Sequence, residues 1–364
     1  MEKAMIWGAG RLFEMYHNDL SAMFEIVGIV DNDSSKEGHI IKGTKVYMPN
    51  SLVNLTFDKL LLITGTGKRE QFLQAVQKLG ILPKNIELIY FSNLNLLNGR
   101  VQHLRIPLEL SEQGEMIVCR EGVRILIRMD SDNWHFEEIL LRDAYAFEID
   151  NKETVCIDIG MNTGIASLYF ANLPYVSKVY SYELFPQSFG VAERNFSLNG
   201  DLNSKITPHN FGLLDRDMNF QATFIGNHPG GSSAVFENHN LWGGGVQTSV
   251  TVKNAAYALK HIYDEHYGKR KILLKIDCEG AEYKILKAME SVGMLEKTDI
   301  IVGEWHVCDR LGDAGGSWDD FTEMRTRLVD SGFVCRYDRF VCKSSDSSDH
   351  ATLYIGAFFA FKTR

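Results

Sequence analysis

The chain has 364 residues, of which 45% are hydrophobic, and this length exceeds what a single hydrophobic core usually organises. Two folded domains are therefore expected. The 47 acidic residues outnumber the 38 lysines and arginines, so the formal net charge is −9. This balance argues against nucleic acid as a partner, because a phosphate-binding surface needs clustered basic side chains.

The N-terminal part of the chain has the pattern of a Rossmann-type unit. An apolar run, Ala4 to Trp7, ends in a glycine turn at residues 8–10, and an amphipathic stretch then leads to a second apolar run that closes with Asp31. Phe13 stands where a dinucleotide site has its third small residue. We therefore expect residues 1–92 to form a small Rossmann-like α/β domain that serves docking or substrate recognition, with a bound nucleotide-sugar left open.

A connecting region follows this domain. Residues 93–114 are polar and lose periodicity, which is typical of a linker. From residue 116 to residue 129 the alternation of apolar and polar residues predicts a β-hairpin with Glu121-Gly122 as its turn, and residues 136–147 predict a helix. These segments lead into the second domain, which is predicted for residues 115–364.

The second domain is expected to be a doubly wound α/β sheet. Its first strand, 154–159, is a buried apolar run that ends in a turn from Gly160 to Gly164 and is followed by a helix. Further strands are predicted near residues 179–182, 206–210, 271–276 and 299–302. The last two, 332–337 and 351–361, are expected to pair antiparallel at the edge of the sheet.

The cysteines and the hydropathy of the chain indicate a reducing, aqueous compartment. Six cysteines are scattered without a C-x-x-C pair, several of them inside apolar runs, as expected of reduced core residues. The first residues carry no long apolar signal region, and no stretch approaches the ~20 apolar residues of a membrane span. We therefore expect a cytoplasmic protein without an integral membrane segment, and its oligomeric state stays open.

Acidic side chains follow four of the predicted strands at the points where the strands end. They are Asp158, Glu183, Asp277 and Glu304. Glu279 and His306 come two residues after the last two of these acids. Because ligands of parallel α/β sheets bind outside the carboxyl ends of the strands, we expect these side chains to face one crevice.

The glycine turn and Glu183 point to a nucleoside cofactor. Gly160 and Gly164 lack a Cβ, which lets the backbone approach a ligand, and an acid at the position of Glu183 accepts hydrogen bonds from ribose hydroxyls. The turn lacks the G-x-G-x-x-G spacing of a pyrophosphate site, while Asp158 places a carboxylate just before it. A carboxylate repels a diphosphate and suits a cation, so S-adenosylmethionine, with its ammonium and sulfonium groups, is the expected cofactor.

From residue 115 onward the chain resembles the FkbM family of methyltransferases. The resemblance rests on the order and spacing of four blocks, 155–164 (VCIDIGMNTG), 182–186 (YELFP), 275–282 (KIDCEGAE) and 304–306 (EWH). It implies a class I methyltransferase sheet and transfer of a methyl group to a hydroxyl oxygen of a sugar, glycan or natural-product glycoside, in polysaccharide or natural-product pathways. Leu184 departs from the more compact E-P-x-P arrangement that is commoner in the family.

The matching positions define an expected cofactor site and an expected catalytic site. The cofactor site comprises Asp158, Gly160, Asn162, Thr163, Gly164, Glu183 and Leu184. The catalytic site comprises Asp277, Glu279, Glu304 and His306. A loop at residues 228–234, too rich in glycine for a helix or strand, is expected to cover the acceptor substrate.

Two mechanisms stay open for the catalytic site. The attacking hydroxyl must lose its proton, so a base within about 2.6 to 3.2 Å is required, and Asp277, Glu279 and His306 are the candidates. The rival is a divalent metal held by Asp277 and Glu304, with or without His306, which lowers the hydroxyl pKa as a Lewis acid. Glu282, on the helix after this block, is as compatible with helix capping as with pairing.

Two other classes of function compete with methyl transfer. An NAD-dependent oxidoreductase or epimerase could act through the N-terminal domain, but this domain lacks a Tyr-x-x-x-Lys pair and a complete G-x-G-x-x-G. A non-catalytic binding protein with a degenerate methyltransferase domain is the third possibility. The acids that remain at every strand end argue against it.

Overall fold

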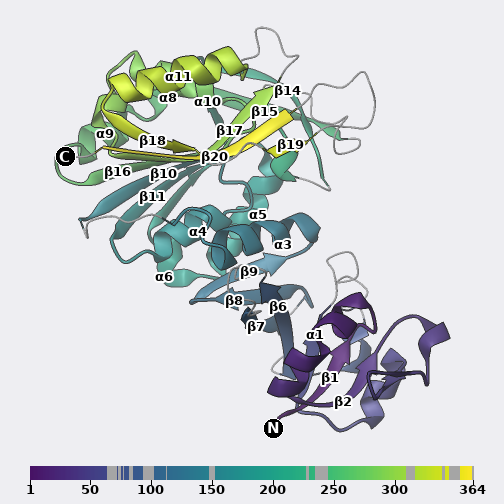
Figure 1. Ribbon diagram of the computed structural model, residues 1–364. Helices are drawn as coiled ribbons and strands as arrows, with labels where there is room; N and C mark the ends of the chain where they lie inside the picture. Colours follow the sequence, from purple (N-terminus) through teal and green to yellow (C-terminus); the bar gives the residue numbers. More distant parts are fainter. Residues whose placement is uncertain are drawn as a thin grey trace. The chain divides into compact units, whose positions relative to one another are not determined.

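The computed structural model divides the chain into two compact units, Met1–Trp134 and His135–Arg364 (Figure 1). It describes residues 1–63, 72, 75–76, 78–81, 85–92, 102–111, 113–146, 152–226, 229–233, 245–308, 316–337, 341–343 and 353–362. Among these residues, no helix combines the length and the apolarity needed to cross a bilayer.

The first unit is built on one mixed sheet with the strand order β3-β4-β2-β1-β5-β6-β7-β8-β9. The strands β4, β2, β1, β5 and β6 run parallel, and the others pair antiparallel. The strands are β1 (Lys3–Trp7), β2 (Glu25–Val30), β3 (Ile40–Ile41), β4 (Thr44–Tyr47), β5 (Lys59–Leu62), β6 (Ile86–Ser92), β7 (Gln102–Leu110), β8 (Met116–Arg120) and β9 (Val123–Ile127). Helix α1 (Arg11–Met23) buries Phe13, Tyr16 and Leu20. The predicted Rossmann-like order of strand, glycine turn, helix and strand is confirmed.

The segment after β6 contributes more regular structure than the sequence predicts. Strand β7 lies within residues 93–114, for which a linker is predicted, while residues 93–101 lie outside the described part of the chain. Ile106 and Leu108 are both buried on β7, and their spacing of two positions is that of residues on one face of a strand. The hairpin β8–β9 forms as predicted, with Glu121 and Gly122 at positive φ in its turn. The predicted helix 136–147 is instead α3 (Asp130–Phe136) followed by a π-helical turn, η5 (Glu137–Leu141).

The second unit contains a sheet with the order β12-β11-β10-β16-β17-β20-β18, and β19 pairs with β20. The five strands β12, β11, β10, β16 and β17 are parallel, and β20 runs antiparallel to its neighbours. The strands are β10 (Thr154–Ile159), β11 (Val176–Tyr182), β12 (Ile206–His209), β16 (Lys271–Ile276), β17 (Ile300–Cys308), β18 (Phe333–Tyr337), β19 (Val341–Lys343) and β20 (Leu353–Lys362). The predicted parallel sheet with an antiparallel edge is confirmed.

Helices cover both faces of this sheet, as a doubly wound fold requires (Figure 1). One face carries α4 (Ile165–Asn172), α5 (Pro186–Ser197) and α6 (Gly200–Asn203), and the other carries α8 (Ala255–Ala258), α9 (Lys260–His266), α10 (Glu282–Glu290) and α11 (Trp318–Asp330). A separate small sheet joins β13 (Gly212–Leu214), β15 (Val246–Asn254) and β14 (Met218–Phe224). The chain builds outward from β10 through β11 to β12 and then returns to β16 on the other side of β10. This reversal places a switch point between β10 and β16, where ligands of such sheets bind.

Candidate active site

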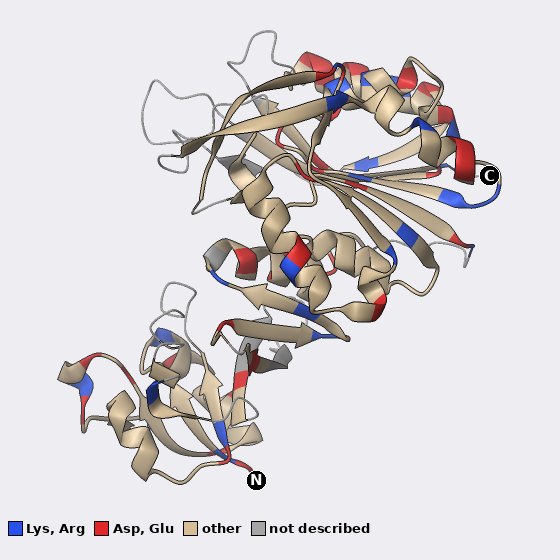
Figure 2. Cartoon of the chain, turned by 180° about the vertical axis from the view of Figure 1, so that it is seen from behind, with Lys and Arg blue, Asp and Glu red and all other residues tan. Residues whose placement is uncertain are grey.

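The acids predicted at the strand ends lie around this switch point. In Figure 2 acidic residues, drawn red, gather where the strands of the larger unit converge. Asp158 lies on β10, Asp277 follows β16, and Glu304 lies on β17, the next strand in the sheet. Glu183 follows β11, on the other side of β10.

The glycine turn after β10 packs directly on the end of β16. Gly160 has a φ of +81°, and a Cβ built there would lie 1.8 Å from the backbone oxygen of Asp277. Gly164 has a φ of +82°, and its Cβ would lie 2.6 Å from the Phe196 ring. Any other residue would be strained at either position, and at Gly160 it would also push the ends of β10 and β16 apart. The turn is therefore shaped by tertiary contacts as well as by local conformation.

Glu183 ties the glycine turn to the end of β11. One carboxylate oxygen accepts a hydrogen bond from the backbone N–H of Asn162 at 2.9 Å, and the other accepts from the N–H of Phe185 at 2.8 Å. Burial raises the pKa of Glu183 to about 7, against the lowering effect of these two hydrogen bonds. A carboxylate has about four acceptor positions, so Glu183 keeps capacity for further donors.

The other two predicted cofactor residues make contacts within the protein. The backbone oxygen of Thr163 accepts from Asn195 Nδ2 at 2.8 Å, which anchors the turn to α5. Leu184 packs beside Gly212, at the start of β13. Thr163 thus lies in the turn, and Leu184 lies just after the end of β11.

Asp158 is fully buried and lies in an ion pair that its sequence context did not reveal. Lys275 Nζ lies 3.1 Å from Asp158 Oδ1 and donates to the Gly160 backbone oxygen at 2.7 Å. Ser167 Oγ donates to Asp158 Oδ2 at 2.5 Å. Burial lowers the pKa of Lys275, but Asp158 and Asp277 outweigh burial and raise it. The negative charge of Asp158, which the sequence predicts beside a cationic ligand, is thus neutralised by Lys275.

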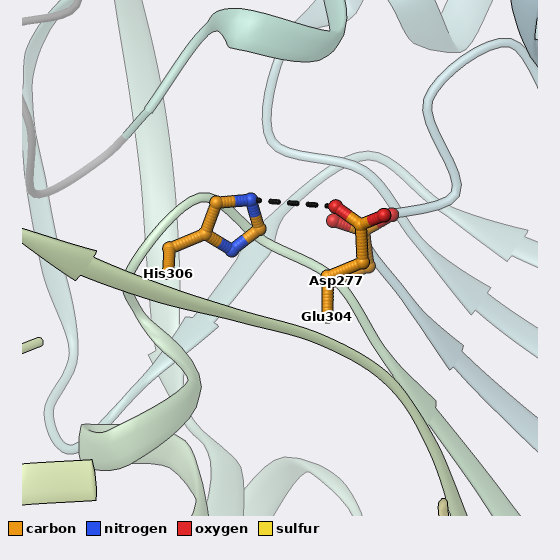
Figure 3. A group of neighbouring side chains, drawn as sticks. All are labelled: Asp277, Glu304 and His306. Atoms are coloured by element: carbon orange, nitrogen blue, oxygen red, sulfur yellow. Dashed lines mark ion pairs between the residues drawn. The ribbon is translucent and has the colours of Figure 1, made fainter. Parts of the chain in front are cut away.

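The four predicted catalytic side chains come together beyond the end of β16, where β17, predicted to end at residue 302, instead continues to Cys308 and carries Glu304 and His306. Asp277, Glu304 and His306 each offer one ligand atom, and these atoms lie within 4.8 Å of one another (Figure 3). His306 Nε2 lies 3.7 Å from Glu304 Oε2 and 3.5 Å from Glu279 Oε1. The imidazole is fully buried, whereas the Asp277 and Glu304 side chains are each 27% exposed. The arrangement can receive a proton from a substrate or hold a cation.

Glu282 pairs with His306, which answers the question that its sequence left open. Its Oε1 accepts from His306 Nδ1 at 2.9 Å and from the backbone N–H of Cys278 at 3.0 Å. Both side chains are completely buried. The pairing gives Nδ1 a carboxylate partner and directs Nε2 toward Asp277 and Glu304 (Figure 3).

Burial and mutual repulsion shift the pKa values of this group upward. Burial, followed by the charge of Asp277, raises the pKa of Glu304 to about 8. Burial also raises the pKa of Glu279, although His306 opposes the shift. Burial disfavours the imidazolium of His306, but Glu279 and Glu282 outweigh burial and raise its pKa well above the usual range.

Two further contacts at the site have no sequence signal. Tyr145 Oη donates to Asp277 Oδ2 at 3.4 Å across 132 positions of sequence, and burial raises the pKa of this phenol. Ser233 Oγ donates to the backbone oxygen of Glu279 at 2.6 Å. Of the loop predicted to cover the acceptor, residues 229–233 are described, and this hydrogen bond ties them to the acid group.

In the first unit, Asp31, which follows β2, has partners within the protein. Asp31 Oδ2 accepts from the backbone N–H of Ala9 at 2.8 Å and pairs with Lys36 Nζ at 3.0 Å. Oδ1 accepts from the N–H of Asp33 at 2.9 Å. These hydrogen bonds, with that of the Lys36 side chain, hold the pKa of Asp31 down although burial raises it.

Comparison with known proteins supports two separate assignments. Residues 1–87 match the family C2185-like, N-terminal, and residues 158–335 match the methyltransferase FkbM domain. Methyltransferase sdnD of Sordaria araneosa is 27% identical over 47% of this chain and 73% of its own length. Methyltransferase 1 of Beauveria bassiana (strain ARSEF 2860) is 27% identical over 56% of this chain and 81% of its own. The crystal structure of methyltransferase FkbM from Methylobacillus flagellatus KT covers 97% of this chain at 12% identity, with 90% of its own length aligned and a TM-score of 0.36.

Proposed function

Because this chain belongs to the FkbM family of methyltransferases, we propose that it transfers the methyl group of S-adenosylmethionine to a hydroxyl oxygen of a sugar, glycan or glycoside. The observation that carries the proposal is the adjacency of two groups at one switch point. The glycine turn follows β10 and is tied to Glu183 after β11, and the acids with His306 lie just beyond the end of β16 and on β17, on the other side of β10. A methyl donor and an acceptor need such neighbouring sites.

The turn and Glu183 would hold the nucleoside part of the cofactor. Glu183 would accept hydrogen bonds from the ribose hydroxyls, for which its carboxylate keeps free acceptor positions. Gly160 and Gly164 let the turn pack closely on the backbone after β16 and on the Phe196 ring. Lys275, on β16, donates to the backbone oxygen of Gly160 and pairs with Asp158, which joins the turn to β16.

The acid group would serve the acceptor. When bound, S-adenosylmethionine supplies an electrophilic methyl group, whose bond to sulfur breaks as the bond to oxygen forms. The attacking hydroxyl releases a proton in this step, and the carboxylates of Asp277, Glu279 and Glu304 are the groups that can take it. Asp277 and Glu304 are the more exposed members, so they are the side chains that a substrate would reach.

We also propose that the protein is cytoplasmic. Cys119, Cys156, Cys278 and Cys335 are free thiols, which fits the cytoplasmic location predicted for the chain.

A calorimetric titration with S-adenosylhomocysteine tests the cofactor site. We expect micromolar affinity in the full chain and a loss of about tenfold or more in Glu183→Ala, because charged hydrogen bonds contribute about 1.5–3 kcal/mol each. Glu193→Ala, an exposed acid on α5, is the matched control and should bind as the wild type does. Absence of binding to the wild type, together with binding of NAD⁺, would overturn the proposal and move the active site to the first unit.

A further inference from the structure

We propose that Asp277, Glu304 and His306 form a binding site for one divalent cation of the Mn²⁺ or Mg²⁺ type. Cation binding rests on the geometry alone. Only the role of the cation in methyl transfer rests on the proposed function, since the site lies where the acceptor hydroxyl is expected. Three ligand atoms, one from the residue after β16 and two from the part of β17 that extends past the end of β16, lie within 4.8 Å of one another. Ligands bound to one ion at about 2.1 Å lie at most about 4.2 Å apart, so a contraction of about 0.6 Å closes the set.

His306 provides the independent observation that points to a ligand. Its side chain is completely buried, and Nδ1 is held by Glu282. Within the described part of the chain Nε2 makes no hydrogen bond, and it faces the two carboxylates (Figure 3). A buried polar atom without a hydrogen bond is costly, and coordination to an ion would satisfy it. A histidine whose second nitrogen is held by a carboxylate is the usual arrangement around protein-bound metals.

The charges around the site favour a cation as its occupant. Four carboxylates, those of Asp277, Glu279, Glu282 and Glu304, approach one imidazole. Lys275 Nζ lies 3.8 Å from Asp277, but it lies nearer to Asp158, at 3.1 Å. A divalent ion would offset the excess negative charge, and two carboxylates with one imidazole suit Mn²⁺ while the oxygens also suit Mg²⁺.

A cation here would assist the proposed methyl transfer. Bound to the acceptor hydroxyl, it would lower the pKa of that hydroxyl as a Lewis acid. The released proton would pass to Glu279, which lies beside His306 outside the set of three ligands and is 16% exposed. No oxidant or further reactant is needed, because the electron pair of the hydroxyl oxygen forms the new bond to carbon and the pair of the old bond stays on sulfur.

The test is Mn²⁺ binding by the full chain after treatment with a chelator. Binding is measured as the loss of the electron paramagnetic resonance signal of free Mn²⁺. We expect one site per chain, with binding abolished in His306→Gln and weakened about 10- to 100-fold in Glu282→Gln, the residue that positions the imidazole. Asp201→Asn, an exposed acid on α6, is the control and should bind as the wild type does.

Binding of S-adenosylhomocysteine to the same samples separates this proposal from the previous one. Variants that keep the nucleoside ligand and lose Mn²⁺ would support the cation site and show that the fold is intact. A wild type that binds the nucleoside ligand but no Mn²⁺ or Mg²⁺, or Mn²⁺ binding that His306→Gln leaves unchanged, would overturn it. A wild type that binds Mn²⁺ but not the nucleoside ligand would refute the proposed cofactor site and leave the cation site standing.

Discussion

Replacing Lys275 with methionine should destabilise the second unit strongly. The Lys275 side chain is 2% exposed and the Asp158 side chain is fully buried, so the variant leaves a carboxylate in the core without its cation. Removing one partner of a buried ion pair costs about 3–5 kcal/mol. The variant also removes the donor to the Gly160 backbone oxygen, at about 1 kcal/mol. We expect a total loss near 5 kcal/mol, which lowers the melting temperature of a unit of this size by about 10–20 °C.

Differential scanning calorimetry is the suitable assay, because it measures the melting temperature directly. Lys287→Met is the matched control, since Lys287 is 40% exposed and its ion pair with Glu323 should contribute at most about 1 kcal/mol. The double variant Asp158→Asn with Lys275→Met should recover part of the loss, because no unpaired charge remains. If Lys275→Met loses no more stability than Lys287→Met, the reasoning about this buried pair is refuted.

Two other perturbations test the glycine turn and Glu183. Gly160→Ala should lower the stability of the second unit by at least about 2 kcal/mol more than Gly268→Ala, because both glycines have positive φ but only the first meets a backbone atom; equal melting temperatures would contradict this. Glu183, with a pKa raised to about 7, becomes protonated as the pH falls and then loses acceptor capacity, so the affinity for S-adenosylhomocysteine should drop about 25-fold from about pH 7.5 to about pH 5.5. Isothermal titration across this range should show the drop in the wild type and a nearly flat profile in Glu183→Gln.

Local sequence pattern was enough to predict the α/β sheet of the second unit. Apolar runs of strand length, glycine turns and the spacing of acids are properties of neighbouring residues, so they can be read without a structure. Because the carboxyl ends of parallel strands meet at one edge, Asp277, Glu279, Glu304 and His306 were expected to converge, and the structure brings them together. The FkbM blocks lie at these strand ends.

The partners of these side chains were decided only by the tertiary structure. Lys275 lies within a quoted block, yet its pairing with Asp158 depends on the register of β16 against β10, where the two residues are opposite each other. Tyr145 reaches Asp277 across 132 positions, and no local pattern specifies such a contact. Glu282 had an ambiguous sequence context, and its pairing with His306 joins α10 to β17 across 24 positions of sequence.

By itself, then, the sequence determined where the strands of the parallel sheet lie and which turn needs glycine, because these properties arise from backbone conformation and the alternation of polar and apolar residues. It did not determine the length of β17, which continues past the predicted end at residue 302 to Cys308. Only the tertiary structure decided which carboxylate meets a lysine, which meets a histidine and which remains accessible. Burial and charge pairing set the pKa values of Glu183, Glu304 and His306, and both depend on side chains brought together from distant parts of the chain.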